Sequence, residues 1–317
     1  MDRMTCNRFT TPAIAAAVAA ILAGTPAIAA TPAVQSGNQA GNQAGNQSGN
    51  NSSARTETTP QRITVASAED LTGRVLRDAQ GRDAGRIEAI VVDLEQGRAL
   101  YALVGSNGSF DVGNSYVPVP FSALKLARND AMNVTIAADK LAKAPRATEG
   151  QLGEYGGADR VGTVYGFYGI PTPLGYVVPP GGRAAAHSGR FTLIRPGEAV
   201  PLAPGGEFAK DLRSETVKAH DGSDAGSIEH VMIDSASGRI AYLLLSRGGL
   251  LGIGEEWVPA QALSWSDKDD AYVLKSGPTD PKQRQGLQKA DVPNQVRRDQ
   301  LQSLYESYGV KPFWQQG

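Results

Sequence analysis

Cysteine is almost absent from this chain of 317 residues, in which Cys6 is the only one. Cys6 lies within a leading segment that we expect to be removed, so the mature chain should contain no thiol. Without thiols there are no disulfides, no thiolate nucleophile and no cysteine metal site. Histidine is scarce too. His187, His220 and His230 are not at metal-ligand spacing, so we expect no zinc site and no cofactor.

Neither positive nor negative charge dominates, because the chain has 31 Lys and Arg and 32 Asp and Glu, which gives a net charge of −1 at pH 7. A nucleic-acid-binding protein normally presents a basic field, so we expect no nucleic-acid partner. Long apolar runs are lacking as well. Ala13–Ala23 is apolar throughout but too short for a transmembrane helix, and no later stretch approaches membrane-spanning length.

Residues 1–29 have the pattern of an export signal. Arg3 and Arg8 give a positive start, Ala13–Ala23 is the apolar centre, and Ala27–Ala29 is a small-x-small cleavage site. We predict cleavage and a periplasmic or secreted protein that is not integral to the membrane. Retention of the segment as an uncleaved anchor is the alternative.

Residues 30–62 are of low complexity. The motif Gly-Asn-Gln-Ala recurs from Gly37, and alanine is the only apolar residue type between Val34 and Ile63. Such a segment cannot offset the entropy of ordering a chain, so we expect a flexible spacer. A tether that holds the domains away from an envelope surface is the alternative.

One stretch occurs twice. Gly81–Leu103 recurs at Gly222–Leu244, displaced by 141 positions. Without a gap, residues 81–118 and 222–259 are identical at 15 of 38 positions, where unrelated stretches would match at about two or three. The sequence is therefore internally duplicated. Past that point Pro120–Leu124 fits Pro259–Leu263 better at an offset of 139, so the first copy has two extra residues between Gly113 and Pro120.

The sequence of each copy predicts short strands separated by turns that contain glycine. In the first copy we expect strands at 73–78, 86–94, 99–104, 116–120, 125–128 and 133–137, and then a helical turn at 139–144. In the second copy we expect strands at 214–219, 226–234, 240–245, 257–259 and 271–275. Strict alternation places Ile87, Ala89 and Val91 on one face of the second strand. That strand is apolar on both faces, as in a small closed sheet that another element covers.

The stretches GRDAGRIEAIVVDLEQGRALYALV, YVPVPFSALKL and DKLAKAP together resemble the PRC-barrel domain family. The resemblance covers residues 66–145 and, less completely, 206–277, because the second copy lacks the DKLAKAP-like end. It implies a mainly β fold of two small, strongly bent β-barrels and a role in binding partners. The motifs are glycines, apolar strands and a proline, so no catalytic residue is carried over.

The connector, residues 146–205, is rich in glycine and aromatic residues. Its aromatic residues include Tyr155, Tyr165, Phe167, Tyr168 and Tyr176. We expect them to lie on the adjacent barrels; an aromatic recognition segment is the alternative. Phe191–Ile194 has the composition of a single extra strand.

The sequence of residues 278–317 predicts a helical tail. Asp280-Pro281 is a helix start, and a second helix should begin near Pro293. An apolar stripe with helical spacing follows, made of Leu301, Leu304, Tyr305 and Tyr308, and Gly309 stands where a helix ends. We expect the stripe to pack on a barrel rather than bind a partner. Phe313-Trp314 either docks the tail or forms a contact site.

Repeated carboxylates are the best candidates for chemistry, and their spacing argues against it. Glu88 and Asp93, with their copies Glu229 and Asp234, are five residues apart, so each pair is roughly 16 Å apart along a strand. Asp93 precedes a turn and should accept backbone N–H bonds there.

Arginine and histidine are the other residue types that could form a functional site. Arg98 and Arg239 could pair with Asp93 and Asp234 across their hairpins. His230 replaces Ala89 and should face the core or the rim rather than a metal. We therefore assign no catalytic, cofactor or metal residues.

These features favour a non-enzymatic binding or scaffold protein of the bacterial envelope, with an unidentified protein or envelope component as its partner. Contacts would come from loops 105–115 and 248–252, the connector and the tail. A small-ligand carrier or an enzyme with a groove between the barrels is one alternative. A role with RNA or the ribosome, by analogy with ribosome-maturation members of the resembled family, is another.

Overall fold

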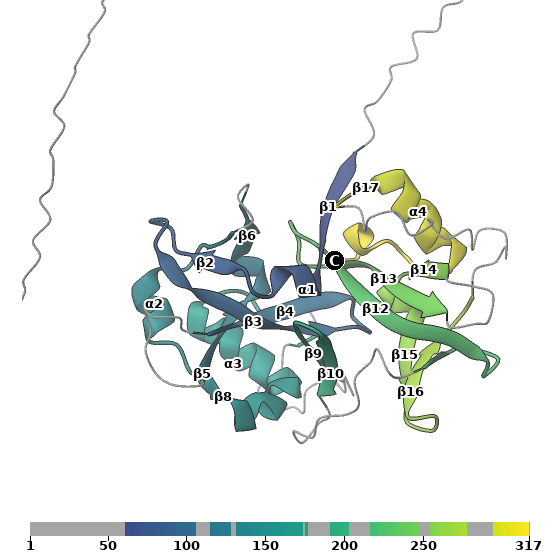
Figure 1. Ribbon diagram of the computed structural model, residues 1–317, viewed down its shortest axis with the longest axis horizontal. Helices are drawn as coiled ribbons and strands as arrows, with labels where there is room; N and C mark the ends of the chain where they lie inside the picture. The colour runs from purple at the N-terminus through teal and green to yellow at the C-terminus, as the bar shows by residue number, and fades with distance from the viewer. Residues whose placement is uncertain are drawn as a thin grey trace, which may run out of the picture. The chain divides into compact units, whose positions relative to one another are not determined.

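The computed structural model describes residues 61–105, 115–127, 131–173, 175–176, 191–202, 216–247, 254–277 and 294–316. The predicted export signal, the spacer up to residue 60, the helix start at Asp280-Pro281 and the loops 106–114 and 248–253 lie outside these residues. The described chain is mainly β, with two curled sheets and a C-terminal helix (Figure 1).

The first sheet is built mostly from the first copy, in the order β6-β7-β2-β3-β4-β5-β8. These strands are β2 (Val75–Arg77), β3 (Asp83–Asp93), β4 (Arg98–Gly105), β5 (Ser115–Pro120), β6 (Leu124–Leu126), β7 (Met132–Val134) and β8 (Ala147–Thr148). The turn η1 (Phe121–Ala123) links β5 to β6, and the helix α2 (Ala138–Ala142) follows β7. The strand β2 pairs with β3 on one side and in parallel with β7 on the other, so the first strand of this copy lies beside one of its last.

The second sheet repeats this order as β14-β13-β12-β11-β16-β15. Its strands are β11 (Val217–Lys218), β12 (Asp224–Asp234), β13 (Ile240–Arg247), β14 (Gly254–Val258), β15 (Leu263–Ser266) and β16 (Ala271–Leu274), with the turn η3 (Ala260–Ala262) before β15. The predicted mainly β fold and the duplication are confirmed.

Strand register locates the two extra residues of the first copy. Val117 is opposite Val104, whereas Glu256 is opposite Leu245. Val104 and Leu245 are 141 apart, but Val117 and Glu256 are 139 apart, so the offset changes before Ser115. The ungapped alignment is therefore wrong over its last residues, because the additional residues lie ahead of β5.

Both long strands carry a β-bulge at equivalent glutamates. The register of β3 against β4 skips Glu88, and that of β12 against β13 skips Glu229. A bulge bends the strand and interrupts the alternation of side-chain faces. The strict alternation of Ile87 with Ala89 and Val91 is therefore wrong, since the bulge lies between Ile87 and Ala89. The prediction of burial on both faces is confirmed, because every apolar residue from Ala89 to Leu94 is at most 1 % exposed.

Each barrel is extended by a strand that precedes the other copy's barrel in the chain. The strand β1 (Arg62–Ser67), which we did not predict, pairs with β12 of the second sheet, and the short helix α1 (Ala68–Leu71) follows it. The strand β9 (Phe191–Arg195) pairs with β3 of the first sheet and with β10 (Glu198–Leu202). This confirms the extra strand predicted at Phe191–Ile194. Phe191 is opposite Asp93, and Val65 is opposite Asp234, so the two strands occupy equivalent edges.

The connector and the tail carry equivalent helices. In the connector, η2 (Glu149–Gly156) leads into α3 (Ala158–Tyr168), and in the tail β17 (Gln295–Arg297) leads into α4 (Arg298–Ser307). Their sequences share the pattern D-x-[V/L]-x-x-[V/L]-Y-x-x-Y-G, displaced by 140 positions. The hydroxyl of Tyr165 donates to the carbonyl of Leu100, and that of Tyr305 donates to the carbonyl of Ala241. The duplication therefore extends beyond the barrels and includes these helices.

Within its described residues, 294–316, the tail differs from its prediction at the start of the helix. The helix begins at Arg298 rather than near Pro293, because residues 295–297 pair with β1 as a strand. The predicted apolar stripe is confirmed, since Leu301, Tyr305 and Tyr308 are buried against the second barrel. The turn η5 (Phe313–Gln315) then docks through the buried ring of Phe313, which contacts Tyr305.

Candidate functional site: the seam between the barrels

The two barrels meet where β4 and β13 begin, at a contact that we call the seam (residues 97–99 and 238–240). Arg98 and Arg239 are opposite one another in an isolated antiparallel bridge. The N–H of Ala99 donates to the carbonyl of Gly238 at 2.8 Å, and the N–H of Ile240 donates to that of Gly97, also at 2.8 Å. Arg98 faces its own copy, Arg239, and the other two contacts are copies of one another with the barrels interchanged. The seam therefore has local pseudo-two-fold symmetry, like the interface of a symmetric dimer.

Side chains cover the seam reciprocally. Gly238 lies against the ring of Phe121 from η1, and Gly97 lies against the amide of Gln261 from η3. Both glycines have positive φ, +59° at Gly97 and +71° at Gly238, which close the hairpin turns and which L side chains rarely adopt. A Cβ at Gly238 would also lie 2.8 Å from Phe121 Cδ1. Glycine is thus required here both for the turn and for the approach of the other barrel.

Two polar contacts extend the same reciprocity. Lys125 Nζ donates to the carbonyl of Ala236 at 3.4 Å, and the backbone N–H of Trp265 donates to Glu95 Oε1 at 2.9 Å. Each joins the strand after a 3-10 turn of one barrel to the hairpin turn of the other. Neither was visible in the sequence, because a single sequence does not say which turns meet.

The repeated aspartates hold the turns that form the seam. Asp93 accepts the N–H of Gln96 at 2.9 Å, and Asp234 accepts those of Ala236 and Ser237, each at 3.2 Å. The turn role predicted for Asp93 is confirmed, and its copy Asp234 has the same role. A contact that we did not predict is added in the first copy, where the buried hydroxyl of Tyr176 donates to Asp93 Oδ2 at 2.7 Å.

The predicted pairing of Arg239 with Asp234 is wrong. The oxygens of Asp234 are used by its own turn, including the hydroxyl of Ser237, and Arg239 Nη2 instead donates to Gln316 Oε1 at 2.6 Å. The residue Arg239 is only 8 % exposed. Burial and, secondarily, the charge of Arg98 lower the pKa of Arg239.

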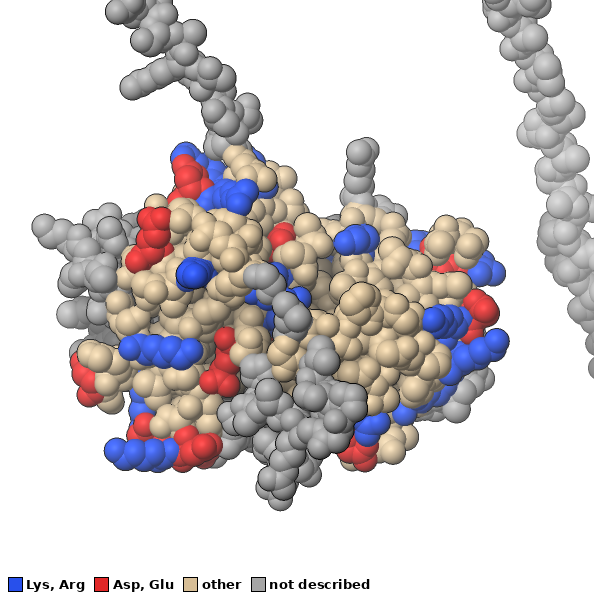
Figure 2. Space-filling model, turned by 180° about the vertical axis from the view of Figure 1, so that it is seen from behind, with Lys and Arg blue, Asp and Glu red and all other residues tan. Residues whose placement is uncertain are grey.

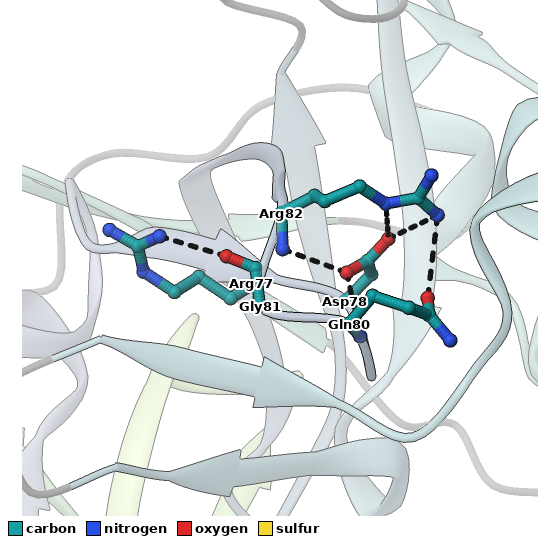
Figure 3. Close-up of polar contacts among 5 residues, drawn as sticks. All are labelled: Arg77, Asp78, Gln80, Gly81 and Arg82. Atoms are coloured by element: carbon teal, nitrogen blue, oxygen red, sulfur yellow. Dashed lines mark hydrogen bonds and ion pairs between the residues drawn. The ribbon is translucent and has the colours of Figure 1, made fainter.

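The first hairpin turn shows the same use of carboxylates (Figure 3). Asp78 Oδ1 accepts the N–H groups of Gln80 and Arg82, each at 2.9 Å, and Oδ2 accepts Arg82 Nε at 2.7 Å. Burial by itself would raise the pKa of Asp78, but these hydrogen bonds and the charge of Arg82 hold it below its usual value. Asp78 is therefore a determinant of the turn.

The aromatic residues of the connector lie on the first barrel. Four of them are at most 6 % exposed, namely Tyr155, Tyr165, Tyr168 and Tyr176. Burial raises the pKa of Tyr165 to about 12, because a phenolate is poorly solvated there. The expected packing on a barrel is confirmed for these four, and a recognition role that needs them exposed is wrong. Phe167 is partly exposed.

His230 lies on the rim, as one of the two predicted placements had it. Its side chain is 39 % exposed, and its Nδ1 lies 3.6 Å from Glu69 Oε2 of α1. The bulge residue Glu229 accepts the hydroxyl of Ser246 at 2.7 Å. Among the described residues, no three His, Cys, Asp or Glu side chains are grouped so that they could hold a metal ion. No described helix has the length and apolar character needed to cross a membrane.

The interior of the first barrel holds a cavity of about 10 Å³, lined by seven residues: Leu76, Ala84, Val104, Gly105, Val117, Val119 and Leu141. This is about the space for one water molecule, whereas small-molecule sites are roughly 300–1,000 Å³. The lining is apolar and includes Leu141 of α2. This cavity therefore does not fit a ligand carrier.

A family model for the PRC-barrel domain matches the chain twice, at residues 64–141 and 204–280. No curated protein matches the chain. The first matched segment contains β2 to β7 and the second contains β11 to β16, whereas β8, β9, β10, α3, β17 and α4 lie outside both of them.

Proposed function

This chain is a tandem PRC-barrel protein, and from that premise we propose that it is a non-enzymatic binding scaffold of the bacterial envelope. PRC-barrel domains are in general non-catalytic. The observation that carries the proposal is the reciprocal seam, which joins the two barrels through backbone hydrogen bonds and through exchanged strands. Two barrels joined in this way can engage a single protein or envelope component at two places.

The use of the polar residues supports binding over chemistry. Asp78, Asp93 and Asp234 each accept backbone N–H groups within their own turns. At the seam, Phe121 and Gln261 lie against the glycines of the opposite barrel, which favours a closed contact over a catalytic groove. On the face seen in Figure 2, basic and acidic side chains are interspersed, which favours a protein or envelope partner over RNA.

The envelope location rests on the sequence of residues 1–29 and calls for its own test. Those residues would be fused to a reporter enzyme that is active only after export. We expect activity, and we expect it to fall when Arg3 and Arg8 are replaced by Glu. A reporter that stays inactive in the cytoplasm would contradict the envelope assignment.

The binding role is tested by capture from an envelope extract with the mature chain as bait. Two variants serve as matched baits: Gly238→Ala, which disturbs the seam, and Gly222→Ala, which has the same backbone strain and nothing within 4 Å of the added Cβ. The partner should be enriched by the wild type and by Gly222→Ala, and depleted with Gly238→Ala. Enrichment of nothing above a tag-only control would overturn the binding role.

A further inference from the structure

Two arginine side chains start from the centre of the seam on the same side. The hydrogen bonds of the bridge connect the neighbours of Arg98 and Arg239, not those residues themselves. This makes them a non-hydrogen-bonded antiparallel pair, the arrangement in which opposite side chains share a face and lie closest, with Cβ atoms roughly 4.5–5.5 Å apart. Like charges directly opposite one another destabilise a sheet.

Arg239 has no carboxylate among its contacts in the described part of the chain. It is 92 % buried, being 8 % exposed, its Nη2 donates to the neutral amide of Gln316, and its Nε has no hydrogen-bond partner among the described residues. The nearest carboxylate in sequence, Asp234, is engaged by the N–H groups and the hydroxyl of its own turn. A buried guanidinium with an unused donor next to a second guanidinium is strongly unfavourable unless an anion compensates it.

We propose that Arg98 and Arg239 form a binding site for a compact oxyanion, a carboxylate or a phosphate, on the pseudo-two-fold axis of the seam. The planar donor fork of arginine matches oxyanions, and two forks that start from one face of the seam can each donate to a different oxygen of one anion. Asp93 stands opposite Arg98 in its hairpin. An incoming oxyanion would accept from Arg239 Nε, the donor that no described residue uses. This inference does not rest on the scaffold proposal.

The test uses the mature chain in chloride buffer at constant ionic strength. Inorganic phosphate and acetate are titrated separately, and the unfolding temperature Tm is followed by circular dichroism. The variants are Arg98→Met and Arg239→Met, which keep side-chain length without charge. Arg297→Met is the control, since Arg297 is exposed and pairs with Asp299 at the surface.

For at least one anion we expect Tm to rise by about 3 °C at a tenfold excess over the dissociation constant, and to keep rising with the logarithm of the anion concentration. Arg297→Met should keep the rise, and both seam variants should lose it. In chloride alone Arg239→Met should be at least as stable as the wild type, because it removes an uncompensated buried charge. A response to phosphate alone assigns the site to phosphate groups, and a response to acetate assigns it to carboxylates.

Three results would overturn the proposal. They are no rise in the Tm of the wild type with either anion, a rise that persists in Arg239→Met, or a marked loss of stability of Arg239→Met in chloride. The last result would mean that an internal carboxylate such as Asp93 already compensates Arg239.

Discussion

The substitution Gly238→Ala probes the seam at its tightest point. Gly238 has φ +71°, and a Cβ there would lie 2.8 Å from Cδ1 and 3.5 Å from Cε1 of Phe121. The ring belongs to η1 of the first barrel, and Phe121 is 2 % exposed, so it has little room to withdraw. The added methyl group therefore both strains the turn and pushes the barrels apart.

The expected magnitude has two parts. A left-handed backbone conformation costs about 1–2 kcal/mol for an L residue. Forcing a methyl group into a packed contact adds about 1–3 kcal/mol. Gly238→Ala should thus lower the free energy of unfolding by about 2–5 kcal/mol. Gly222→Ala has φ +83° and no atom within 4 Å of the added Cβ, so only the backbone part applies.

Urea unfolding monitored by circular dichroism measures both variants, and the informative quantity is the difference between them. A double-mutant cycle with Phe121→Ala assigns that difference to the seam, since the excess cost of Gly238→Ala should vanish when the ring is absent. If Gly238→Ala is no more destabilising than Gly222→Ala, Phe121 does not press on Gly238 and the packing described for the seam is wrong.

Three further substitutions have defined outcomes. Tyr176→Phe removes the donor to the buried carboxylate of Asp93 and should destabilise by about 1.5–3 kcal/mol in urea unfolding; Tyr242→Phe should be neutral, because the buried Tyr242 hydroxyl has no hydrogen-bond partner among the described residues. Equal losses in the two variants would contradict this. Tyr165→Phe and Tyr305→Phe should lose similar amounts, about 1 kcal/mol each, because their hydroxyls bond equivalent carbonyls; a loss confined to one would argue against equivalent helices. Asp78→Asn should be less stable than the wild type at pH 7. Because the pKa of folded Asp78 lies below its usual 3.8, this gap should persist down to about that pH and close as the pH falls further, and a gap independent of pH would exclude the carboxylate as its source.

The barrels could be predicted from the sequence because their determinants are local. Turn glycines, alternating apolar residues and the gap-free recurrence of Gly81–Leu103 at Gly222–Leu244 specify short strands and a duplication. Asp93 was identifiable as a turn residue from its distance to Gly97. The bulge at Glu88 escaped prediction, because a bulge adds a residue without changing the composition of the strand.

The equivalence of α3 and α4 could have been predicted from the sequence, but we did not predict it. The pattern that ends in Tyr165 and Tyr168 recurs 140 positions later at Tyr305 and Tyr308. The glycines of α3 hid its helical period, since Gly162 and Gly166 replace the polar residues found in α4.

The seam and the exchanged strands could not be predicted from this sequence. Nothing in Arg62–Ser67 says which of two homologous edges it will pair with, since β3 and β12 offer nearly the same partner. Likewise Gly97 and Gly238 are explained fully by their turns, so their second role as contact points emerges only when both barrels are in place.

Amide hydrogen exchange at Ala99 and Ile240, followed by NMR on the mature chain, tests the central claim most directly. These two N–H groups are the reciprocal donors across the seam. If the barrels form one unit, both amides should exchange slowly and at similar rates, as slowly as those within the ladder of β3 and β4, and Gly238→Ala should accelerate both. Exchange of either amide at the rate of an exposed turn would contradict the seam and, with it, the view of the two barrels as a joint binding scaffold.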